Sequence, residues 1–466
     1  MSSLPVVPPV AASRTTEPES SVTRSGVLLA EVVSLAKRRG FVFPSAEIYG
    51  GFRSAYDFGP LGVNLLDNVK AAWWRSMVQL RSDVVGLSAS ILSPLAVWEA
   101  SGHLANFSDP LVDCRACGVR QRADHLSDPA ICPSCGAQGS LTEARPFNLM
   151  FKTHAGPVET EAAVAYLRPE TAQGMFVNYS NVASTARRNP PFGIAQIGKS
   201  FRNEITPGNF VFRTREFEQM EMEYFVPPEQ AEAWYRYWCE ERLAWYVDLG
   251  IPARALRLRA HSPEELSHYS SGTSDIEFAF PWGWGELEGI ANRGDWDLTQ
   301  HSRHSGVALE HLDPASGRRY TPHVIEPAAG ATRAAFAFLI AAYDTDEVSG
   351  SSRSVLRLDP RLAPYQVAVL PLRREPELVE MTEEVLGLLR PWFMCDTDST
   401  QSIGRRYRRQ DEIGTPVCVT VDHTSLVDRR VTVRDRDSTA QERIGLDGLV
   451  WHLNRQLGRP LPSPGA

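Results

Sequence analysis

The sequence feature that most constrains the fold is a regular alternation of residue types between Phe212 and Glu223. In a β-strand, alternate side chains share one face. One face of the predicted strand is therefore apolar and carries Met220 and Met222. The opposite face carries, in order along the strand, Arg213, Arg215, Phe217, Gln219, Glu221 and Glu223.

A shorter run of the same kind precedes it. Phe201–Glu204 places Arg202 and Glu204 on one face, and Pro207-Gly208-Asn209 supplies turn residues between the two runs. Together the runs predict a polar strand face with arginines, an aromatic ring and then carboxylates. Such a face can bind a nucleotide beside an ammonium group, because arginine binds phosphate, a ring stacks on a base and carboxylates hold a cation. The alternative is a solvated charged hairpin, which Phe217 among the charges disfavours.

Four of the seven cysteines form two CxxC pairs, Cys114–Cys117 and Cys132–Cys135, separated by 14 residues. Each pair can form a knuckle, and four thiolates close a tetrahedral structural zinc site with no open position for chemistry. Gly118 and Gly136 follow the pairs directly, where the backbone must turn tightly. We therefore predict a zinc-ribbon insertion over residues 110–145, with redox-active or unpaired cysteines as the alternative.

The composition is that of a folded soluble protein, with 43% hydrophobic and 22% charged residues among 466. No run approaches the roughly 20 apolar residues that a bilayer span requires. The first residues lack the pattern of a secretory signal, so we expect a cytoplasmic protein without membrane association. The net charge of −8 argues against non-specific coating of nucleic acid but is compatible with a local basic patch.

Changes in composition and periodicity divide the chain. Residues 1–24 are rich in Pro, Ser and Thr and predict a disordered tail. Residues 25–348 combine helical stripes with Gly- and Pro-bounded apolar runs that suggest antiparallel strands. Residues 349–362 are predicted to form a linker. In residues 363–466 strands alternate with helices, which indicates a separate α/β domain.

Three segments resemble the motifs of class II aminoacyl-tRNA synthetases. Arg202–Glu204 with Arg215-Glu216-Phe217 resembles motif 2, Glu326–Arg333 resembles motif 3, and Ser93–His103 resembles motif 1, which packs the dimer. The closer resemblance, over about residues 26–460, is to glycyl-tRNA synthetases of the homodimeric type. It rests on further segments: Tyr56–Gly62, Leu167–Gly174, Gly289–Gly294 and Ser402–Gly414.

The resemblance implies an α+β fold: a class II antiparallel sheet flanked by helices, a zinc-ribbon insertion and a C-terminal α/β anticodon-binding domain. It implies a glycine–tRNA ligase, which forms glycyl-adenylate from glycine and ATP and transfers glycine to the 3′ end of tRNA-Gly. ATP, Mg²⁺ and structural Zn²⁺ would be needed, and the protein would be a homodimer. Two alternatives remain, namely a non-catalytic accessory or binding protein and a ligase that loads an amino acid onto a carrier protein.

The resemblance also implies roles for individual residues. The catalytic residues would be Arg202, Glu204 and Arg333. The ATP-binding set would be Arg202, Asn203, Glu204, Phe212, Arg213, Arg215, Phe217, Glu286, Leu287, Gly330 and Arg333. The glycine-binding set would be His103, Glu170, Phe217, Gln219, Glu221, Glu326 and Gly330. Arg202 would bind the α-phosphate and the glycine carboxylate, Phe217 would stack on adenine, Arg333 would hold the γ-phosphate, and Glu286 would reach ATP directly or through Mg²⁺.

A cluster of arginines near the C-terminus is the predicted tRNA contact, with a solvated helix face as the alternative: Arg405, Arg406, Arg408 and Arg409. One departure from the family concerns Ala328, where many members carry serine. Because the glutamates of the glycine site remain, we expect this change to be neutral.

Overall fold

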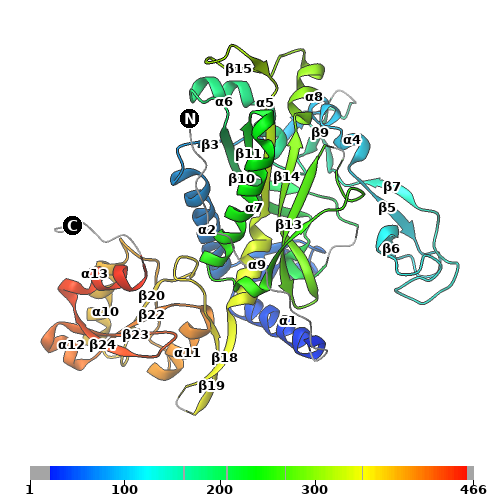
Figure 1. Cartoon of the computed structure of the whole chain (residues 1–466). Helices are drawn as coiled ribbons and strands as arrows, with labels where there is room; N and C mark the ends of the chain where they lie inside the picture. Colours follow the sequence, from blue (N-terminus) through cyan, green and yellow to red (C-terminus); the bar gives the residue numbers. More distant parts are fainter. Residues whose placement is uncertain (1–20, 161–162, 206–207, 268, 349, 459–466) are drawn as a thin grey trace.

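A computed structural model of the chain describes residues 21–160, 163–205, 208–267, 269–348 and 350–458. Two bodies are visible in Figure 1, a large one built on a seven-stranded sheet and a smaller C-terminal one built on a five-stranded sheet. The tail predicted over residues 1–24 lies outside the described residues as far as residue 20. Helix α1 (Ser21–Arg38) already begins within the last four residues of that prediction.

The large sheet has the strand order β12-β13-β14-β17-β11-β10-β3. All neighbours are antiparallel except β10 and β3. This antiparallel sheet confirms the α+β class. The strands are β3 (Val84–Gly86), β10 (Phe192–Phe201), β11 (Glu216–Val226), β12 (Leu256–Ala260), β13 (Gly272–Phe280), β14 (Gly283–Gly294) and β17 (His323–Gly330).

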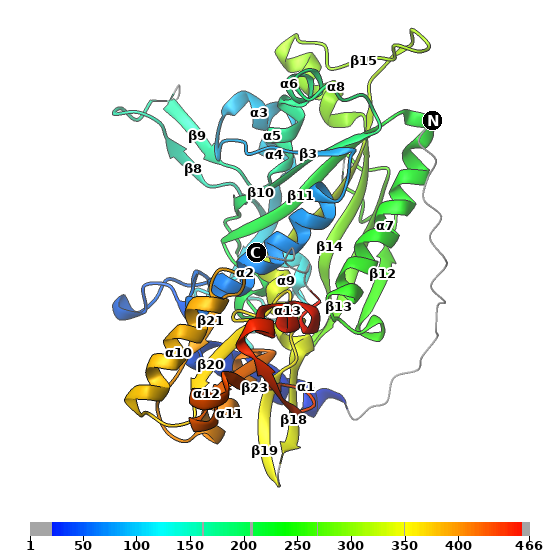
Figure 2. The same ribbon diagram turned by 90° about the vertical axis from the view of Figure 1, so that its left-hand side faces the viewer.

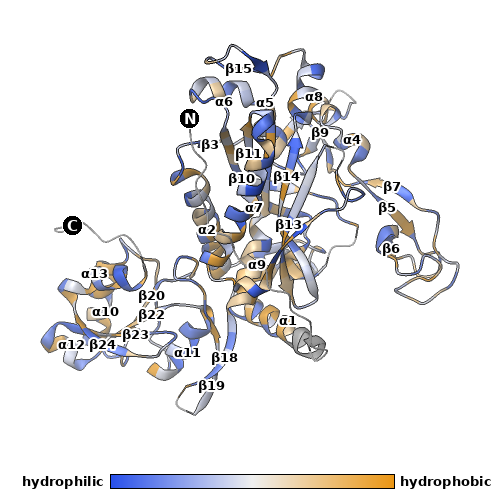
Figure 3. Ribbon diagram, in the orientation of Figure 1, coloured by the Kyte–Doolittle hydropathy of each residue, from blue (hydrophilic) through white to orange (hydrophobic). Residues whose placement is uncertain are grey.

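Helices α2 (Pro60–Trp74), α7 (Ala231–Asp248) and α9 (Ala331–Ala342) pack with α1 on one face of this sheet. Met220 and Met222 are fully buried in this layer, as the alternation predicts. Helix α2 starts with Pro60 at its first turn, where a missing N–H costs nothing, and ends in a π-helical turn over Arg75–Gln79. Helix α9 is drawn largely in the apolar colours of Figure 3 and is buried on almost every side.

The opposite sheet face is only partly covered. Helices α5 (Ala172–Val177), α6 (Tyr179–Thr185) and α8 (Trp296–Ser305) bury one end of it, over Ile194, Phe225 and Val324. Helix α3 (Leu95–Ala100) packs against α8, and α4 (His103–Asn106) packs against α3. The rest of this face, over β11, β17, β14 and β13, borders a cavity.

Smaller sheets surround this body. A three-stranded sheet of β5 (Ser108–Asp113), β6 (Arg120–Arg122) and β7 (Arg145–Asn148) projects from it, cyan in Figure 1. A second small sheet combines β4 (Leu92–Pro94), β8 (Lys152–His154) and β9 (Val164–Leu167). Two hairpins are formed by β1 (Val42–Pro44) with β2 (Tyr56–Phe58) and by β15 (His311–Leu312) with β16 (Arg319–Tyr320).

The C-terminal body is an α/β domain, with strand order β21-β20-β22-β23-β24. Strands β21 (Cys395–Thr397), β20 (Val367–Pro371) and β22 (Val417–Val421) are parallel, and β23 (Arg430–Asp435) and β24 (Gln441–Gly445) continue the sheet antiparallel. Its helices are α10 (Pro376–Leu389), α11 (Ile403–Ile413), α12 (His423–Asp428) and α13 (Leu446–Gln456). Among the described residues no helix has the length and apolarity to cross a membrane.

A hairpin of β18 (Tyr343–Val348) and β19 (Ser351–Leu356) joins the two bodies and extends below them in Figure 2. Part of the predicted linker, 349–362, is therefore strand. The sequence pattern did not predict this strand, because one of its buried residues is the charged Arg353, beside the apolar Val355 and Leu356. The side chains of Asn64 and Asn68 on α2 also donate to backbone carbonyls of residues 362–364 and thereby tie the linker to the large body.

Candidate active site

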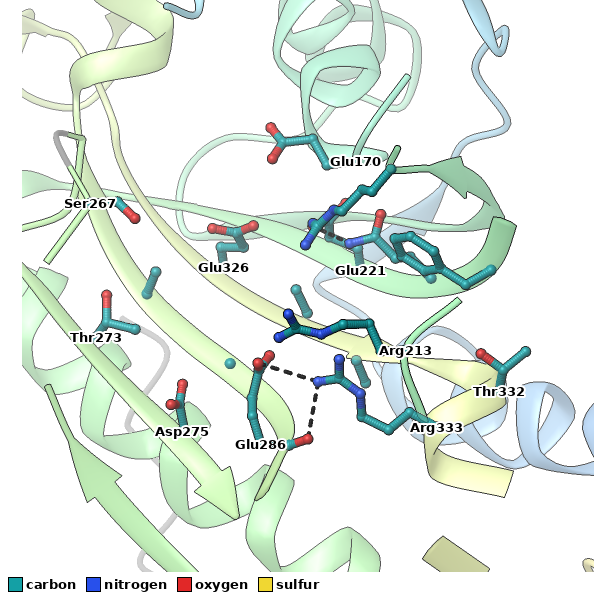
Figure 4. Close-up of a pocket in the computed structure, with 18 of the residues that line it drawn as sticks. Glu170, Arg213, Glu221, Ser267, Thr273, Asp275, Glu286, Glu326, Thr332 and Arg333 are labelled. Carbon is teal, nitrogen blue, oxygen red and sulfur yellow. Dashed lines mark hydrogen bonds and ion pairs between the residues drawn. The ribbon is translucent and has the colours of Figure 1, made fainter. Parts of the chain in front are cut away.

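The cavity on the open face of the large sheet gathers most of the predicted site residues. It is lined from β11 by Phe217, Gln219 and Glu221, and from β17 by Glu326 and Gly330. Glu170, Arg202, Glu204, Phe212, Arg213, Glu286 and Arg333 complete the predicted residues that border it. Figure 4 shows the carboxylates of Glu170, Glu221 and Glu326 toward one end, and Arg213, Arg333 and Glu286 toward the other.

At the arginine end, Arg333 is held by three polar contacts and one aromatic ring. Its Nη1 lies 3.2 Å from Glu286 Oε2 and donates to the Glu286 carbonyl at 3.0 Å (Figure 4). Its Nε donates to the Phe212 carbonyl at 3.3 Å, and the guanidinium lies 4.4 Å from the centre of the Phe212 ring. Arg213 Nη1 lies 3.7 Å from Glu204 Oε2. Each guanidinium thus has a carboxylate partner and keeps an edge toward the cavity.

Arg202 lies between the two ends, next to Glu170 and close enough to Glu286 to help Arg333 lower the pKa of that acid. Its Nε donates to the Pro169 carbonyl at 3.0 Å, and its guanidinium lies 5.3 Å from the centre of the Phe217 ring. The carbonyl contact fixes the side chain next to Glu170, the residue that follows Pro169. A ligand with an anionic group in the middle would therefore meet Arg202.

At the carboxylate end, Arg293 links the acids to the scaffold. This residue is 1% exposed, and its Nη1 donates to Glu326 Oε2 at 2.8 Å. Its other nitrogens donate to both carboxylate oxygens of Asp297 on α8, at 2.7 and 2.9 Å. Glu221 accepts from the backbone N–H of Thr171 at 2.9 Å, and Glu170 accepts from Gln173 at 2.9 Å.

The acids differ in their ionisation. Burial raises the pKa of Glu221 well above its usual range, and the neighbouring Glu326 and Glu170 raise it further. Burial also raises the pKa of Glu326, although Arg293 opposes this. For Glu170, burial is outweighed by His103, Arg293 and Gln173, so that its pKa is lowered. Glu170 is therefore the acid best able to keep its negative charge although it is buried.

Four predicted residues do not line the cavity. Leu287 lies in the hydrophobic core on the helix side of the sheet. Arg215 precedes strand β11 and donates to the carbonyls of Arg53 and Glu204, at 3.1 and 3.3 Å. The backbone N–H of Asn203 donates to the Leu149 carbonyl at 2.7 Å. His103 is buried behind Glu170, with Nε2 3.2 Å from Glu170 Oε2.

Other residues border the cavity without having been predicted. Strand β13 contributes Thr273 and Asp275, which are two residues apart and so share one face of the strand. The loop before it contributes His261, Ser267 and Tyr269. Small residues line the floor: Gly289, Ala291, Ala328 and Ala329. For the strand residues, the alternation of side chains along residues 273–291 could have indicated which of them face the cavity. For Arg293 and for the loop residues the sequence offered no comparable signal.

The four cysteines of the two CxxC pairs meet in the projecting sheet. Their Sγ atoms all lie within 4.8 Å of one another. Cys114 Sγ is 3.8 Å from Cys135 Sγ, and Cys117 Sγ is 3.8 Å from Cys132 Sγ. Four thiols at this spacing fit a single tetrahedral metal ion.

The arginine cluster on α11 divides into two kinds of residue. Arg406 is 1% exposed, and its guanidinium donates to the carbonyls of Pro371, Leu372 and Asp398. Arg406 therefore connects α11 to the end of β20 and is too buried to contact a ligand. Arg405 is exposed, while Arg408 and Arg409 are half-buried.

Comparison with known proteins identifies both bodies. A family model described as "Anticodon binding domain" matches residues 366–456. The chain is similar to a crystal structure of prolyl-tRNA synthetase from Cryptosporidium parvum, complexed with halofuginone and AMPPNP, at a TM-score of 0.63 and 15% identity. That alignment covers 92% of this chain and 76% of the other, and it supports the class II synthetase fold.

Similarity to curated proteins is much higher. The chain is 55% identical to the glycine–tRNA ligase of Bifidobacterium longum (strain NCC 2705), over 92% of this chain and 93% of the relative. It is 55% identical to that of Mycolicibacterium vanbaalenii, over 92% and 98%, and 53% identical to that of Streptomyces coelicolor, over 91% and 98%. Identity of this extent, over more than nine-tenths of the chain, shows that the chain belongs to the glycine–tRNA ligase family.

Proposed function

We propose that this chain activates glycine with ATP to form glycyl-adenylate and then transfers the glycyl group to the 3′ end of tRNA-Gly. One observation carries the proposal: a single cavity presents guanidinium groups at one end and three carboxylates at the other. Phosphates match the first end and the ammonium group of glycine matches the second. Membership of the glycine–tRNA ligase family supports the same reaction.

The first step needs no general base. A glycine carboxylate oxygen forms a bond to the α-phosphorus of ATP, the bond from that phosphorus to the bridging oxygen breaks, and pyrophosphate leaves. The attacking carboxylate is already ionised, so catalysis depends on positioning and on stabilisation of the negative charge at phosphorus. Arg202, held beside Glu170 by the Pro169 carbonyl, binds the α-phosphate and the glycine carboxylate together.

Other residues of the cavity hold the nucleotide and its magnesium ion. Phe217 stacks on adenine, and Arg333 binds the γ-phosphate in place of one of its contacts to Glu286. Glu286 and Asp275 both face the cavity, and their carboxylates lie close to each other near Gly289. A Cβ atom on Gly289 would be 3.8 Å from Asp275 Oδ1 and 4.0 Å from Glu286 Oε1. Carboxylate oxygens are the ligands that Mg²⁺ prefers, so Glu286 would hold this ion, which neutralises phosphate charge when bound.

Selection of glycine depends on closure of the cavity, since the substrate has no side chain to recognise. An extra methyl group changes binding by only about 1–3 kcal/mol in a pocket that admits it. The ammonium group lies among Glu170, Glu221 and Glu326. Steric exclusion of a Cβ then discriminates between glycine and larger amino acids.

The C-terminal body supplies contacts to tRNA. We propose Arg405, Arg408 and Arg409 for the phosphate backbone, without Arg406, which is 1% exposed. A zinc ion in the four-cysteine site stabilises the ribbon. A homodimer packed through residues 93–103 and a cytoplasmic location stay predictions.

Glycine-dependent exchange between pyrophosphate and ATP tests the first step, and charging of tRNA-Gly tests the second. Exchange with glycine and charging of the tRNA are the expected results. No exchange in zinc-loaded protein would favour a non-catalytic accessory protein. Exchange without charging, together with transfer to a carrier protein, would favour the carrier-protein ligase.

A further inference from the structure

Behind the glycine end of the cavity lies an acid to which neither the fold nor the proposed reaction gives a role. Glu223 on β11 is 0% exposed. Among the described residues, neither of its carboxylate oxygens has a hydrogen-bond partner. Its carboxylate approaches those of Glu221 and Glu326, and one oxygen from each of the three lies within 4.8 Å of the others.

The three acids of this cluster have unequal partners. Glu221 accepts from the backbone N–H of Thr171 at 2.9 Å and also from the Thr171 hydroxyl. Glu326 accepts from Arg293 at 2.8 Å. Such donors stabilise an ionised carboxylate, and Glu223 has none. An isolated buried charge is strongly unfavourable. Burial raises the pKa of Glu221 as well, but Glu221 has two donors from Thr171 and Glu223 has none, so Glu223 is the acid of this cluster least able to ionise.

The surroundings supply little positive charge. Glu223 faces Glu326 on β17, Arg293 on β14, Asp297 on α8 and Glu221 on its own strand, with Ile194 opposite it on β10. Arg293 divides its donors between Glu326 and both oxygens of Asp297. Burial and the nearby Glu326 accordingly raise the pKa of Glu223 well above its usual range.

We propose that Glu223 carries a proton in the free protein and releases it to solvent when the ammonium group of glycine enters the cavity. This inference rests on the proposed function, because it takes glycine as the ligand. The incoming positive charge replaces the proton as the counter-charge of the cluster. The proton thus prevents repulsion among the acids of the empty cavity, and the site favours ligands with a cationic group.

The sign of the pH dependence follows from this exchange. Glycine binds best to the deprotonated cluster, so its affinity rises with pH while the free protein holds the proton, by up to about tenfold per pH unit for one proton released. The affinity then levels off once the free protein is itself deprotonated. Glycine keeps its ammonium group throughout pH 6–8, so the ligand adds no slope of its own.

Calorimetric titration of glycine into the full chain tests the proposal. Titrations at one pH, in buffers of different ionisation enthalpy, report the number of protons released, and titrations from pH 6 to 8 report the slope of the affinity. We expect about one proton released and an affinity that rises with pH. Binding of glycine without proton release would overturn the inference and leave the proposed function intact. No binding at any pH would contradict the proposed function itself.

Glu223→Gln identifies the proton carrier, because an amide keeps the shape of the protonated acid and cannot release a proton. We expect its proton release to fall toward zero and its affinity to become nearly independent of pH. Glu218→Gln is the matched control, since Glu218 lies on the same strand but contacts Lys70 of α2, at 3.1 Å. Release unchanged in Glu223→Gln would show that another acid carries the proton. If this variant does not fold, the buffer series on the unmodified chain still decides whether a proton is released.

Discussion

Arg293 donates to Glu326 at 2.8 Å and, at 2.7 and 2.9 Å, to both carboxylate oxygens of Asp297. The first contact reaches the carboxylate end of the cavity and the other two reach helix α8. Arg293 is buried and its guanidinium also lies 3.8 Å from the centre of the Tyr269 ring. One side chain therefore fixes both an acid of the cavity and a ring that borders it.

Replacement of Arg293 by methionine should raise the KM for glycine at least tenfold and leave the KM for ATP nearly unchanged. Removal of one partner from a buried ion pair also costs about 3–5 kcal/mol of folding stability. Pyrophosphate exchange at varied glycine and ATP, with thermal unfolding, measures both effects. Arg303→Met, at an exposed position on α8, the helix that carries Asp297, is the control. Equal changes in both KM values would contradict a role specific to glycine.

Replacement of Arg333 or Arg202 by alanine should reduce exchange by about 10²–10³-fold, because each removes a positive group aimed at phosphate. Neither change should unfold the protein, since both side chains border the cavity. Arg236→Ala, on the solvent side of α7, should keep full activity. Near-normal exchange by either cavity variant would refute the assignment of that arginine to the phosphates.

The alternation of residues 217–223 predicted both faces of β11 correctly, because strand geometry is local. Arg215 does not line the cavity as the alternation predicted, because the strand begins one residue later, at Glu216. The same rule would have excluded Leu287, which is adjacent to Glu286 and so points to the opposite face. Arg293 on β14 and Glu223 on β11 meet Glu326 on β17, a strand far from both in sequence, so no local pattern could reveal these contacts.

A β-bulge shows another limit of sequence patterns. On β14 the register with β13 shifts between Glu286 and Glu288. Glu288 consequently faces the helices, where it forms a fully buried ion pair with Arg242 at 2.7 Å. A strict period of two would have placed Glu286 and Glu288 together in the cavity. Bulges depend on strand pairing, which the alternation of a single segment does not show.

Ala328→Ser should change the KM for glycine by no more than about tenfold, because one added hydrogen bond is worth roughly 0.5–1.5 kcal/mol. Ala328 pairs with Glu221 on one side and with Gly289 on the other, and Gly289 leaves room for a hydroxyl. Exchange at varied glycine measures the effect. A larger gain in affinity would mean that the serine common in the family contributes directly to binding.

Cys132→Ser should abolish metal binding, whereas the unmodified chain should hold about one zinc ion. Elemental analysis of purified protein measures the metal, and thermal unfolding should show lower stability without it. Cys239→Ser is the control, because Cys239 lies on α7, away from the cluster. A fully active preparation of the unmodified chain that holds no zinc would contradict a structural zinc site.

The hairpin between the two bodies is tied to helix α11 by buried ion pairs. Arg353 on β19 contacts Asp346 on β18 at 2.6 Å and Asp411 on α11 at 2.8 Å. Asp411 is fully buried and also pairs with Arg434, at 2.8 Å. Helix α9 carries Arg333 in its first turn, beside the cavity, and leads directly into β18. This joint therefore determines where the arginines of α11 lie relative to the active site.

Asp346→Asn should therefore lower kcat/KM for tRNA charging several-fold while glycine-dependent exchange, which needs no tRNA, stays unchanged. The variant removes the negative charge that pairs with Arg353 on the hairpin and keeps the buried Asp411, so the C-terminal domain should remain folded. Glu347→Gln, at the exposed neighbouring position of the same strand, should affect neither reaction. Equal losses of exchange and charging in Asp346→Asn would point to general destabilisation, and normal charging would show that the joint does not position the tRNA-binding helix.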